Sequence, residues 1–267
     1  MTPCRWWKCC LQLISEKLRP VDCYAIDLKI RSISRYNMEH IPYKIFQTWE
    51  TKDHPPGMRD SIQSIQEDNP EFEYFFFDDN DRREYIRKYY PADVLEAYDT
   101  LIPGAFRADL WRYCVLYNEG GIYMDVKFKC FNHAKLLELT DKEYFAMDPT
   151  GKVMVNGLMA CFPGNPKLMK AIRQIVVHVQ NREYCHCDIA VTGPALLGSF
   201  FTEEEKKECF VLNGEYTEGR NGLRWYEGDH AIRLHGKQII VSYFGFYMET
   251  APFKRYGQLW SERNIYR

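Results

Sequence analysis

The sequence predicts an α/β fold in which helices flank a mostly parallel central sheet. From Ile41 onward, short runs rich in aromatic and β-branched residues alternate with longer helical stretches, the pattern expected when helices connect parallel strands. Proline and glycine stand at the borders between these runs, where they end regular structure. With 267 residues and 46% hydrophobic content the chain can form a full core, and this composition excludes disordered and fibrous proteins.

The first predicted elements run strand, helix, strand, helix. Residues 43–49 (YKIFQTW) form a β-rich run, and a Pro-Gly pair then opens a helix over 57–69. The second strand is predicted at 73–77 (EYFFF), directly before a cluster of acidic and amide side chains that can cap the next helix. That helix extends over 79–90, and a proline follows each of the two helices and prevents its continuation.

The next helix and strand are the most clearly bounded. Pro103 stands at the start of a helix over 104–119, and Gly120-Gly121 ends it and allows a sharp turn into a strand over 122–128. The later elements are less sharply marked: strands at 144–147, 153–162 and 237–243 and an amphipathic helix at 166–181.

Charge divides the chain into two parts. Residues 1–37 carry seven basic and three acidic side chains, so we predict a cationic, cysteine-containing N-terminal extension followed by one domain over 38–267. Overall, 35 Lys and Arg balance 37 Asp and Glu, which excludes a surface built to bind nucleic acid through its phosphates.

No stretch reaches the roughly 18 apolar residues that a membrane span requires. We therefore expect a soluble, cytoplasmic protein with no transmembrane segment, while 1–37 leaves open a peripheral membrane contact.

The ten cysteines are expected to be mostly reduced and buried as small hydrophobic side chains. An alternative is a four-thiolate zinc site made by Cys9-Cys10 together with Cys185 and Cys187, although neither spacing is the usual two-residue knuckle.

The segment 107–127 carries the densest set of functional side chains. On its predicted helix, Asp109 and Arg112 are three residues apart and project from one face. A fixed carboxylate beside a fixed guanidinium can hold a ribose diol and a phosphate, but the same spacing also makes an ordinary ion pair. On the strand that follows, Tyr123, Asp125 and Lys127 point to one side. A polar row therefore lies at the carboxyl end of a strand, where open α/β sheets bind ligands.

Four motifs follow one another in the chain: Ile41-Pro42-x-Lys44-Ile45-x-Gln47-Thr48-Trp49, Arg107-Ala108-Asp109-x-x-Arg112-Tyr113, Gly120-Gly121-Ile122-Tyr123-x-Asp125, and Asn156-Gly157-x-Met159-Ala160. In order and separation they resemble glycosyltransferases of family 32, which carry a DXD motif and include capsular polysaccharide and outer-chain mannosyltransferase enzymes. The resemblance implies the GT-A fold over 38–267. It also implies transfer of a sugar from a UDP- or GDP-sugar to an acceptor hydroxyl on a glycan or other acceptor, with the anomeric configuration retained.

The resemblance also implies roles for individual residues. It assigns Asp125 as the first DXD carboxylate and Asn156 as an amide directed at the donor sugar or its phosphate. The expected donor-binding residues are Trp49 against the base, Asp109 and Arg112 at the ribose and donor, Tyr123 beside the nucleoside, and Trp260 in a loop that closes over the donor.

The sequence departs from the DXD pattern at its second carboxylate, where it has Lys127. A protonated lysine cannot ligate a metal. We favour a catalytic site in which Lys127 takes the place of the cation. In the alternative, Asp125 still binds Mn²⁺ or Mg²⁺ with the diphosphate and a distant group such as Asp229 or His230. A third interpretation is a non-catalytic nucleotide-sugar or glycan-binding module with a degenerate site.

Overall fold

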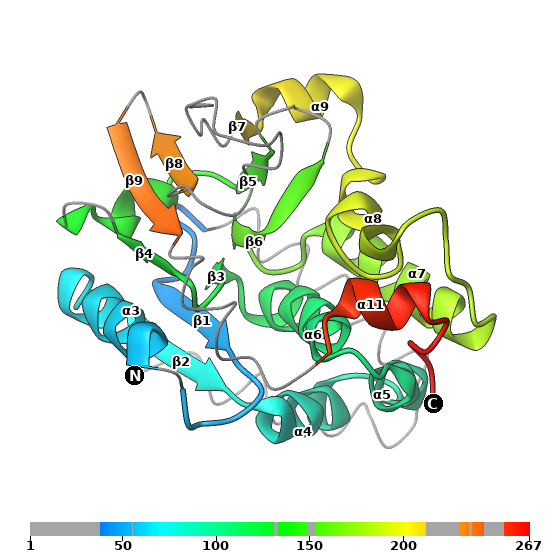
Figure 1. Cartoon of the computed structure of the whole chain (residues 1–267). Coiled ribbons are helices and arrows are strands. Elements are labelled where there is room, and N and C mark those ends of the chain that lie inside the picture. The colour runs from blue at the N-terminus through cyan, green and yellow to red at the C-terminus, as the bar shows by residue number, and fades with distance from the viewer. Residues whose placement is uncertain are drawn as a thin grey trace, which may run out of the picture. The chain divides into compact units, whose positions relative to one another are not determined.

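The computed structural model describes residues 38–54, 56–130, 133–148, 153–211, 230–234, 237–242 and 254–267 (Figure 1). Every element described below lies in the compact unit Glu39–Arg267. The predicted cationic extension 1–37 lies outside the described residues, and the domain boundary stays a prediction.

A six-stranded sheet forms the centre of the fold. Its strand order is β2-β1-β3-β6-β5-β7. The strands are β1 (Lys44–Thr48), β2 (Glu73–Phe77), β3 (Gly121–Met124), β5 (Tyr144–Met147), β6 (Met154–Cys161) and β7 (Phe210–Val211). Three of the five neighbouring pairs are parallel, which confirms the predicted mostly parallel sheet, and β6 runs antiparallel to both of its neighbours.

Helices cover this sheet, as predicted. They are α3 (Pro56–Asp68), α4 (Asp79–Tyr89), α5 (Ala92–Thr100), α6 (Gly104–Glu119), α7 (Pro166–Gln180), α8 (Pro194–Gly198), α9 (Glu203–Glu208) and α11 (Tyr256–Ser261), with short 3-10 turns η2 (Leu136–Leu139) and η3 (Asp188–Ala190). Alternation along β3 decides which helices pack on which face. Ile122 and Met124 join Ile65 of α3 in one hydrophobic cluster, whereas the Tyr123 ring lies 6.3 Å from that of Trp111 on α6.

The central helix is α6, in which eleven of sixteen residues are buried. It contacts α4, α7, β3 and β6 (Figure 1), and Asp109 and Arg112 are buried along with its apolar side chains. At its end Gly120 and Gly121 have φ values of +63° and +105°, and a Cβ at Gly121 would lie 2.7 Å from the Lys44 carbonyl oxygen. The predicted turn therefore requires glycine for its backbone conformation and for its close approach to β1.

The predicted strand over 122–128 is wrong in its second half. β3 ends at Met124, and the Phe128 N–H donates to the Asp125 carbonyl oxygen at 2.9 Å, which closes a tight turn. The chain then enters a second, antiparallel sheet of order β4-β9-β8, built from β4 (Phe128–Cys130), β9 (Lys237–Ser242) and β8 (His230–Leu234). Asp125 thus lies at the crossing between two sheets.

Most other element predictions are confirmed. The strands at 73–77 and 144–147 and the helix at 104–119 have the predicted bounds. Asp78 caps α4 in a reciprocal pair with Asp81. The sequence did not predict α5, α8, α9, α11, β7 and β8. These are short elements, too brief to show a hydrophobic period.

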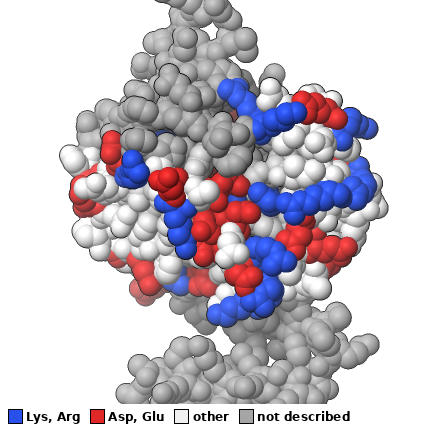
Figure 2. All heavy atoms as spheres, turned by 60° about the horizontal axis from the view of Figure 1, so that its bottom comes forward, with Lys and Arg blue, Asp and Glu red and all other residues white. Residues whose placement is uncertain are grey.

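The described surface is mixed in charge. Figure 2 shows acidic and basic side chains interspersed on one face of the molecule. None of the helices in the described ranges combines the length and the apolar character needed to span a bilayer. Cys114, Cys130 and Cys161 are buried and form no disulfide, as expected, whereas Cys9 and Cys10 lie outside the described residues.

Candidate active site

The candidate site lies at the carboxyl end of two parallel neighbours, β1 and β3. Trp49 follows β1 directly and Asp125 follows β3 directly. The strands are in register, with Phe46 opposite Tyr123, so the two residues emerge at the same edge of the sheet. This is the edge at which the sequence predicted ligand binding.

The Asp125 carboxylate has a partner on each oxygen. Oδ1 accepts a hydrogen bond of 2.7 Å from the Tyr123 hydroxyl and lies 3.3 Å from Nη1 of Arg112. Oδ2 lies 3.2 Å from the Lys127 ammonium nitrogen. The turn after Met124 therefore brings Tyr123, Asp125 and Lys127 together, as the sequence predicted for a continuous strand.

The carboxylate of Asp125 is ionised and still accessible. Removal from water would raise its pKa, but the charges of Lys127 and Arg112, together with the Tyr123 hydroxyl, hold that pKa below its usual value. The side chains of Asp125 and Lys127 remain 21% and 25% exposed. A ligand can thus reach a site that holds one fixed anion between two cations.

Gly157 on β6 makes room for this carboxylate. The backbones are joined by the Asp125 N–H, which donates to the Gly157 carbonyl oxygen at 2.8 Å. A Cβ on Gly157 would lie 2.8 Å from Oδ2 of Asp125 and 3.2 Å from the Phe128 ring. Any residue other than glycine would have to displace the carboxylate.

Arg112 connects the Asp125 cluster to β6. Its Nη1 donates to the Asn156 carbonyl oxygen at 2.9 Å, and its guanidinium lies 4.4 Å from the centre of the Tyr123 ring, within cation–π range. Burial would lower its pKa, but Tyr123 and the carboxylates around it raise that pKa above the usual value. Arg112 is a permanently charged guanidinium that is only 7% exposed.

Asp109 binds neighbours on other elements more closely than it binds Arg112. Its Oδ1 accepts from the Asn156 side-chain amide at 2.8 Å, and its Oδ2 accepts from the Thr192 hydroxyl at 2.8 Å. Arg112 Nη2 lies 3.5 Å from Oδ1. Burial raises the pKa of Asp109, with Arg112 and the two hydrogen bonds opposing that rise. Asp109 therefore ties α6 to β6 and to the segment before α8.

The side-chain NH₂ group of Asn156 donates two hydrogen bonds, and both acceptors are side chains of α6. Nδ2 donates to Asp109 and, at 2.9 Å, to the hydroxyl oxygen of Tyr113. Asn156 is thus next to the predicted donor residues, and its contact with a donor sugar stays a prediction. Thr192 and Tyr113 were not predicted as site residues, although Tyr113 lies in the second motif and a Thr-Gly-Pro run follows at 192–194.

A buried ionic cluster holds the turn that carries Trp49. Arg82 of α4 is 1% exposed, and it donates to the Thr48 hydroxyl at 3.1 Å and to the Glu50 carboxylate at 2.9 Å, on either side of Trp49. Arg107 of α6 binds the second Glu50 oxygen at 3.1 Å. The cluster joins the turn after β1 to the start of α6, and the sequence analysis missed it because its members are far apart in the chain.

Trp260 lies with a different set of neighbours. It belongs to α11, and its indole N–H donates to the Tyr184 carbonyl oxygen at 2.6 Å. No contact found among the described residues joins it to Asp125 or Arg112. Its role as a lid over the donor stays a prediction, as does base stacking by the half-buried Trp49.

Comparison with known proteins bears on what this site does. Residues 55–146 match the family model described as "Glycosyltransferase sugar-binding region containing DXD motif". Inositol phosphoceramide mannosyltransferase 2 of Schizosaccharomyces pombe is 28% identical over 259 residues, which cover 88% of this chain and 74% of that protein. Mannosyl phosphorylinositol ceramide synthase CSH1 of Saccharomyces cerevisiae is 25% identical over 245 residues, 83% of this chain and 64% of that protein.

The chain is a glycosyltransferase. The matches support the resemblance to family 32, and the matched region of this glycosyltransferase contains Asp109, Arg112, Tyr123, Asp125 and Lys127. A solved structure, "PaToxG Glycosyltransferase", has a TM-score of 0.49 and 15% identity, and the match covers 67% of this chain and 75% of that chain.

The side chains around Asp125 bear on whether the candidate site fits a divalent metal ion. DXD sites hold such an ion with two carboxylates and diphosphate oxygens. Across the described part of the chain, Asp125 is flanked by Lys127 and Arg112, with no second carboxylate that pairs with it. The described residues therefore do not form a two-carboxylate clamp, whereas Asp229 and the side chain of His230, the predicted distant ligands, lie outside the description.

Proposed function

We propose that this glycosyltransferase moves a sugar from a UDP- or GDP-sugar to an acceptor hydroxyl, with retention, and that the Asp125 cluster binds the diphosphate. The observation that supports this most directly is the pair of cations, Arg112 and Lys127, on either oxygen of one carboxylate. The cluster lies at the sheet edge where Trp49 also emerges. The proposed donor site thus runs from Trp49 to Lys127.

The chemistry needs positive charge at the leaving group. Breaking the bond between sugar and diphosphate leaves negative charge on the phosphate oxygens, and a fixed cation stabilises that charge. One carboxylate with one ammonium has the same net charge as two carboxylates with a divalent ion. We therefore propose that Lys127, held 3.2 Å from Asp125, stabilises the departing diphosphate in place of a metal.

The test is donor turnover in the presence of a chelator. Transfer and hydrolysis of labelled UDP- and GDP-sugars are expected to persist in EDTA, and Lys127→Met is expected to abolish them because the cation is lost. Complete loss of activity in EDTA with rescue by manganese would refute the role of Lys127 and favour the alternative in which Asp125 retains a metal.

Donor binding is tested at Asp109 and Arg112. Because both are buried and hydrogen-bonded, we choose the near-isosteric Asp109→Asn and Arg112→Lys and monitor folding by circular dichroism alongside donor affinity by calorimetry. Affinity is expected to fall at least tenfold in both, while the exposed Arg87→Ala on α4 leaves it unchanged. Unaltered affinity in both buried variants would leave the pair a purely structural contact.

The relatives suggest a donor and an acceptor. Those reported above are named for transferring mannose and for inositol phosphoceramide, so we propose a nucleotide-linked mannose as donor and an inositol phosphoceramide-like lipid as acceptor. A panel of nucleotide sugars, each with this lipid or with free inositol, separates a lipid acceptor from a soluble one. Location in the cytoplasm and membrane contact through 1–37 stay predictions.

A second candidate is a binding module without transfer, and Lys127 at the second DXD position is the feature that favours it. Both candidates predict donor binding. Only the enzyme predicts release of the nucleoside diphosphate from a bound donor, so measuring that release over several hours separates them.

A further inference from the structure

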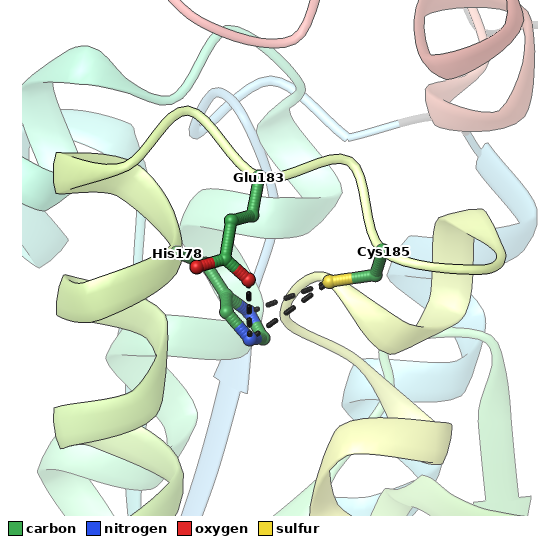
Figure 3. Close-up of side chains that lie close together, drawn as sticks. All are labelled: His178, Glu183 and Cys185. Carbon is green, nitrogen blue, oxygen red and sulfur yellow. Dashed lines mark hydrogen bonds and ion pairs between the residues drawn. The ribbon is translucent and has the colours of Figure 1, made fainter.

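A second cluster of chemically reactive side chains lies outside the donor site, at the end of α7 (Figure 3). His178 projects from the last turn of α7, and Glu183 and Cys185 belong to the loop that follows. A ring nitrogen, a carboxylate oxygen and a sulfur from these three residues all lie within 4.8 Å of one another. Neither the glycosyltransferase motifs nor the proposed donor contacts include any of the three.

The tautomer of His178 is determined by its neighbour. The ring is 7% exposed, and Nδ1 lies 2.8 Å from the Val191 carbonyl oxygen. A carbonyl oxygen can only accept, so Nδ1 must carry the proton in the neutral ring, and the lone pair is on Nε2. A backbone carbonyl on the distal nitrogen is the usual way in which a metal-binding histidine is oriented.

The Glu183 carboxylate lies near Nε2 of this ring, and the Cys185 sulfur lies beside the ring, about equally far from both nitrogens. Oε2 of Glu183 is 3.9 Å from Nε2, and Sγ of Cys185 is 3.8 Å from Nε2 and 3.7 Å from Nδ1. A nucleophilic triad would need an acid on the nitrogen opposite the thiol. Here the Val191 carbonyl occupies Nδ1, so the three groups do not form such a triad.

The spacing is close to that of a zinc site. Zinc bonds of about 2.3 Å to sulfur and 2.0–2.2 Å to nitrogen and oxygen, at tetrahedral angles, place ligand atoms roughly 3.3–3.6 Å apart. The observed 3.8 and 3.9 Å are a few tenths of an ångström wider. Because the sulfur lies beside the ring, rotation about the Cα–Cβ bond of the half-buried Cys185 is needed to bring it into line with Nε2.

The loop that carries these groups is held in place from two sides. The Glu183 N–H donates to the His178 carbonyl oxygen at 2.8 Å, which fixes the loop to the end of α7. Two side chains of the C-terminal segment hold the loop from the other side. The Trp260 indole N–H donates to the Tyr184 carbonyl oxygen at 2.6 Å, and the Tyr266 hydroxyl donates to the Glu183 carbonyl oxygen. The ligand groups are therefore presented by a fixed backbone.

We propose that His178 Nε2, the Glu183 carboxylate and the Cys185 thiolate bind one zinc ion, with a water molecule as fourth ligand. On binding, the thiol loses its proton to solvent and the sulfur forms the metal bond, so one proton is released for each ion bound. Nitrogen, oxygen and sulfur ligands together suit zinc better than magnesium or calcium, which prefer oxygen alone. A zinc ion at this place would join α7 to the loop that α11 secures.

The test uses the full chain, freed of metal with a chelator and then titrated with Zn²⁺ and, separately, Co²⁺. Cysteines outside this cluster could also bind metal, so Cys185→Ser is compared with Cys209→Ser, which changes a half-buried cysteine after α9. We expect Cys185→Ser to lose one zinc equivalent and the sulfur-to-cobalt absorption band, whereas Cys209→Ser retains both. His178→Gln should lose the same equivalent.

Thermal unfolding gives a second measurement. Zinc is expected to raise the Tm of the parent chain and of Cys209→Ser by the same amount, and to leave that of Cys185→Ser unchanged. Equal zinc content in the parent chain and Cys185→Ser, or no zinc bound by the parent chain, would overturn the proposal. These readouts do not depend on sugar transfer, so they are independent of the proposed function.

Discussion

Gly157→Ala tests whether the space beside Asp125 is essential to the site. The added Cβ would lie 2.8 Å from Oδ2, whereas ordinary contacts of a Cβ begin at 3.4 Å. The carboxylate must therefore move by about 0.6 Å or more, away from a position fixed by Lys127, Arg112 and Tyr123. Overpacking of this kind costs about 1–3 kcal/mol of folding stability.

The effect on activity should exceed the effect on stability. If Asp125 positions the groups that bind the diphosphate, a displacement of this size is expected to lower kcat/KM by about 10²-fold, since misplacement by roughly 1 Å has this effect in other enzymes. Donor turnover and urea unfolding, measured on the same preparation, separate the two losses.

Gly198→Ala is the matched control. Its Cβ would lie 3.5 Å from Met154, an ordinary contact. Because Gly198 is the last residue of α8, alanine there should leave the folding stability unchanged or increase it by at most about 1 kcal/mol. Gly198→Ala should retain full activity. Equal activity in Gly157→Ala and Gly198→Ala would refute the reasoning, because the carboxylate would then tolerate displacement.

Three further predictions concern the support of the site. Arg82→Ala removes one partner from a buried ionic cluster and should cost about 3 kcal/mol in urea unfolding, whereas Arg87→Ala on the exposed side of the same helix should cost at most about 0.5 kcal/mol. Because the pKa of Asp125 is lower in the folded than in the unfolded chain, its ionised carboxylate stabilises the fold. This contribution is complete above the unfolded pKa of about 3.9 and is lost as the pH falls through the pKa of the folded state. Lys127→Met should raise that folded pKa, so unfolding by acid should begin at a higher pH, and an unchanged acid transition would contradict this. Asn165→Ala removes the cap of α7 and should lower the stability by about 1 kcal/mol, seen as a reduced Tm.

The sequence predicted α6 and its glycine end correctly because local rules determine both. Proline begins the helix, two glycines allow the backbone to turn, and each effect is confined to a few neighbouring residues. The same local rules predicted a straight strand through Asp125. They could not foresee that β4 pairs with β9, more than a hundred residues later, and draws the chain out of the first sheet.

The structure brings Asp109, Arg112, Tyr123, Asp125, Lys127 and Asn156 together, whereas Trp260 has other neighbours, and the roles of all these residues stay predictions. Spacing on one helix suggested that Asp109 and Arg112 pair with each other, yet the shorter hydrogen bonds of Asp109 go to Asn156 and Thr192, which are 47 and 83 residues away. Sequence spacing reports neighbours along one element and says nothing of partners across the fold. Of the two cations around Asp125, Lys127 could be predicted because it is two residues away. Arg112 belongs to the preceding motif, and its contact with Asp125 is formed only by the fold.

The crossing between the sheets has a consequence for synthesis on the ribosome. The six-stranded sheet is complete once Val211 has emerged, but β4 waits for β9, which ends at Ser242. Until then, of the two sheets described, only the first holds the turn that carries Asp125, through β3 and the Gly157 carbonyl oxygen of β6. A nascent or truncated chain that stops between these points would form the central sheet, while the proposed donor site would still lack the support of the second sheet. Maturation of the activity should therefore lag behind folding of the core during translation.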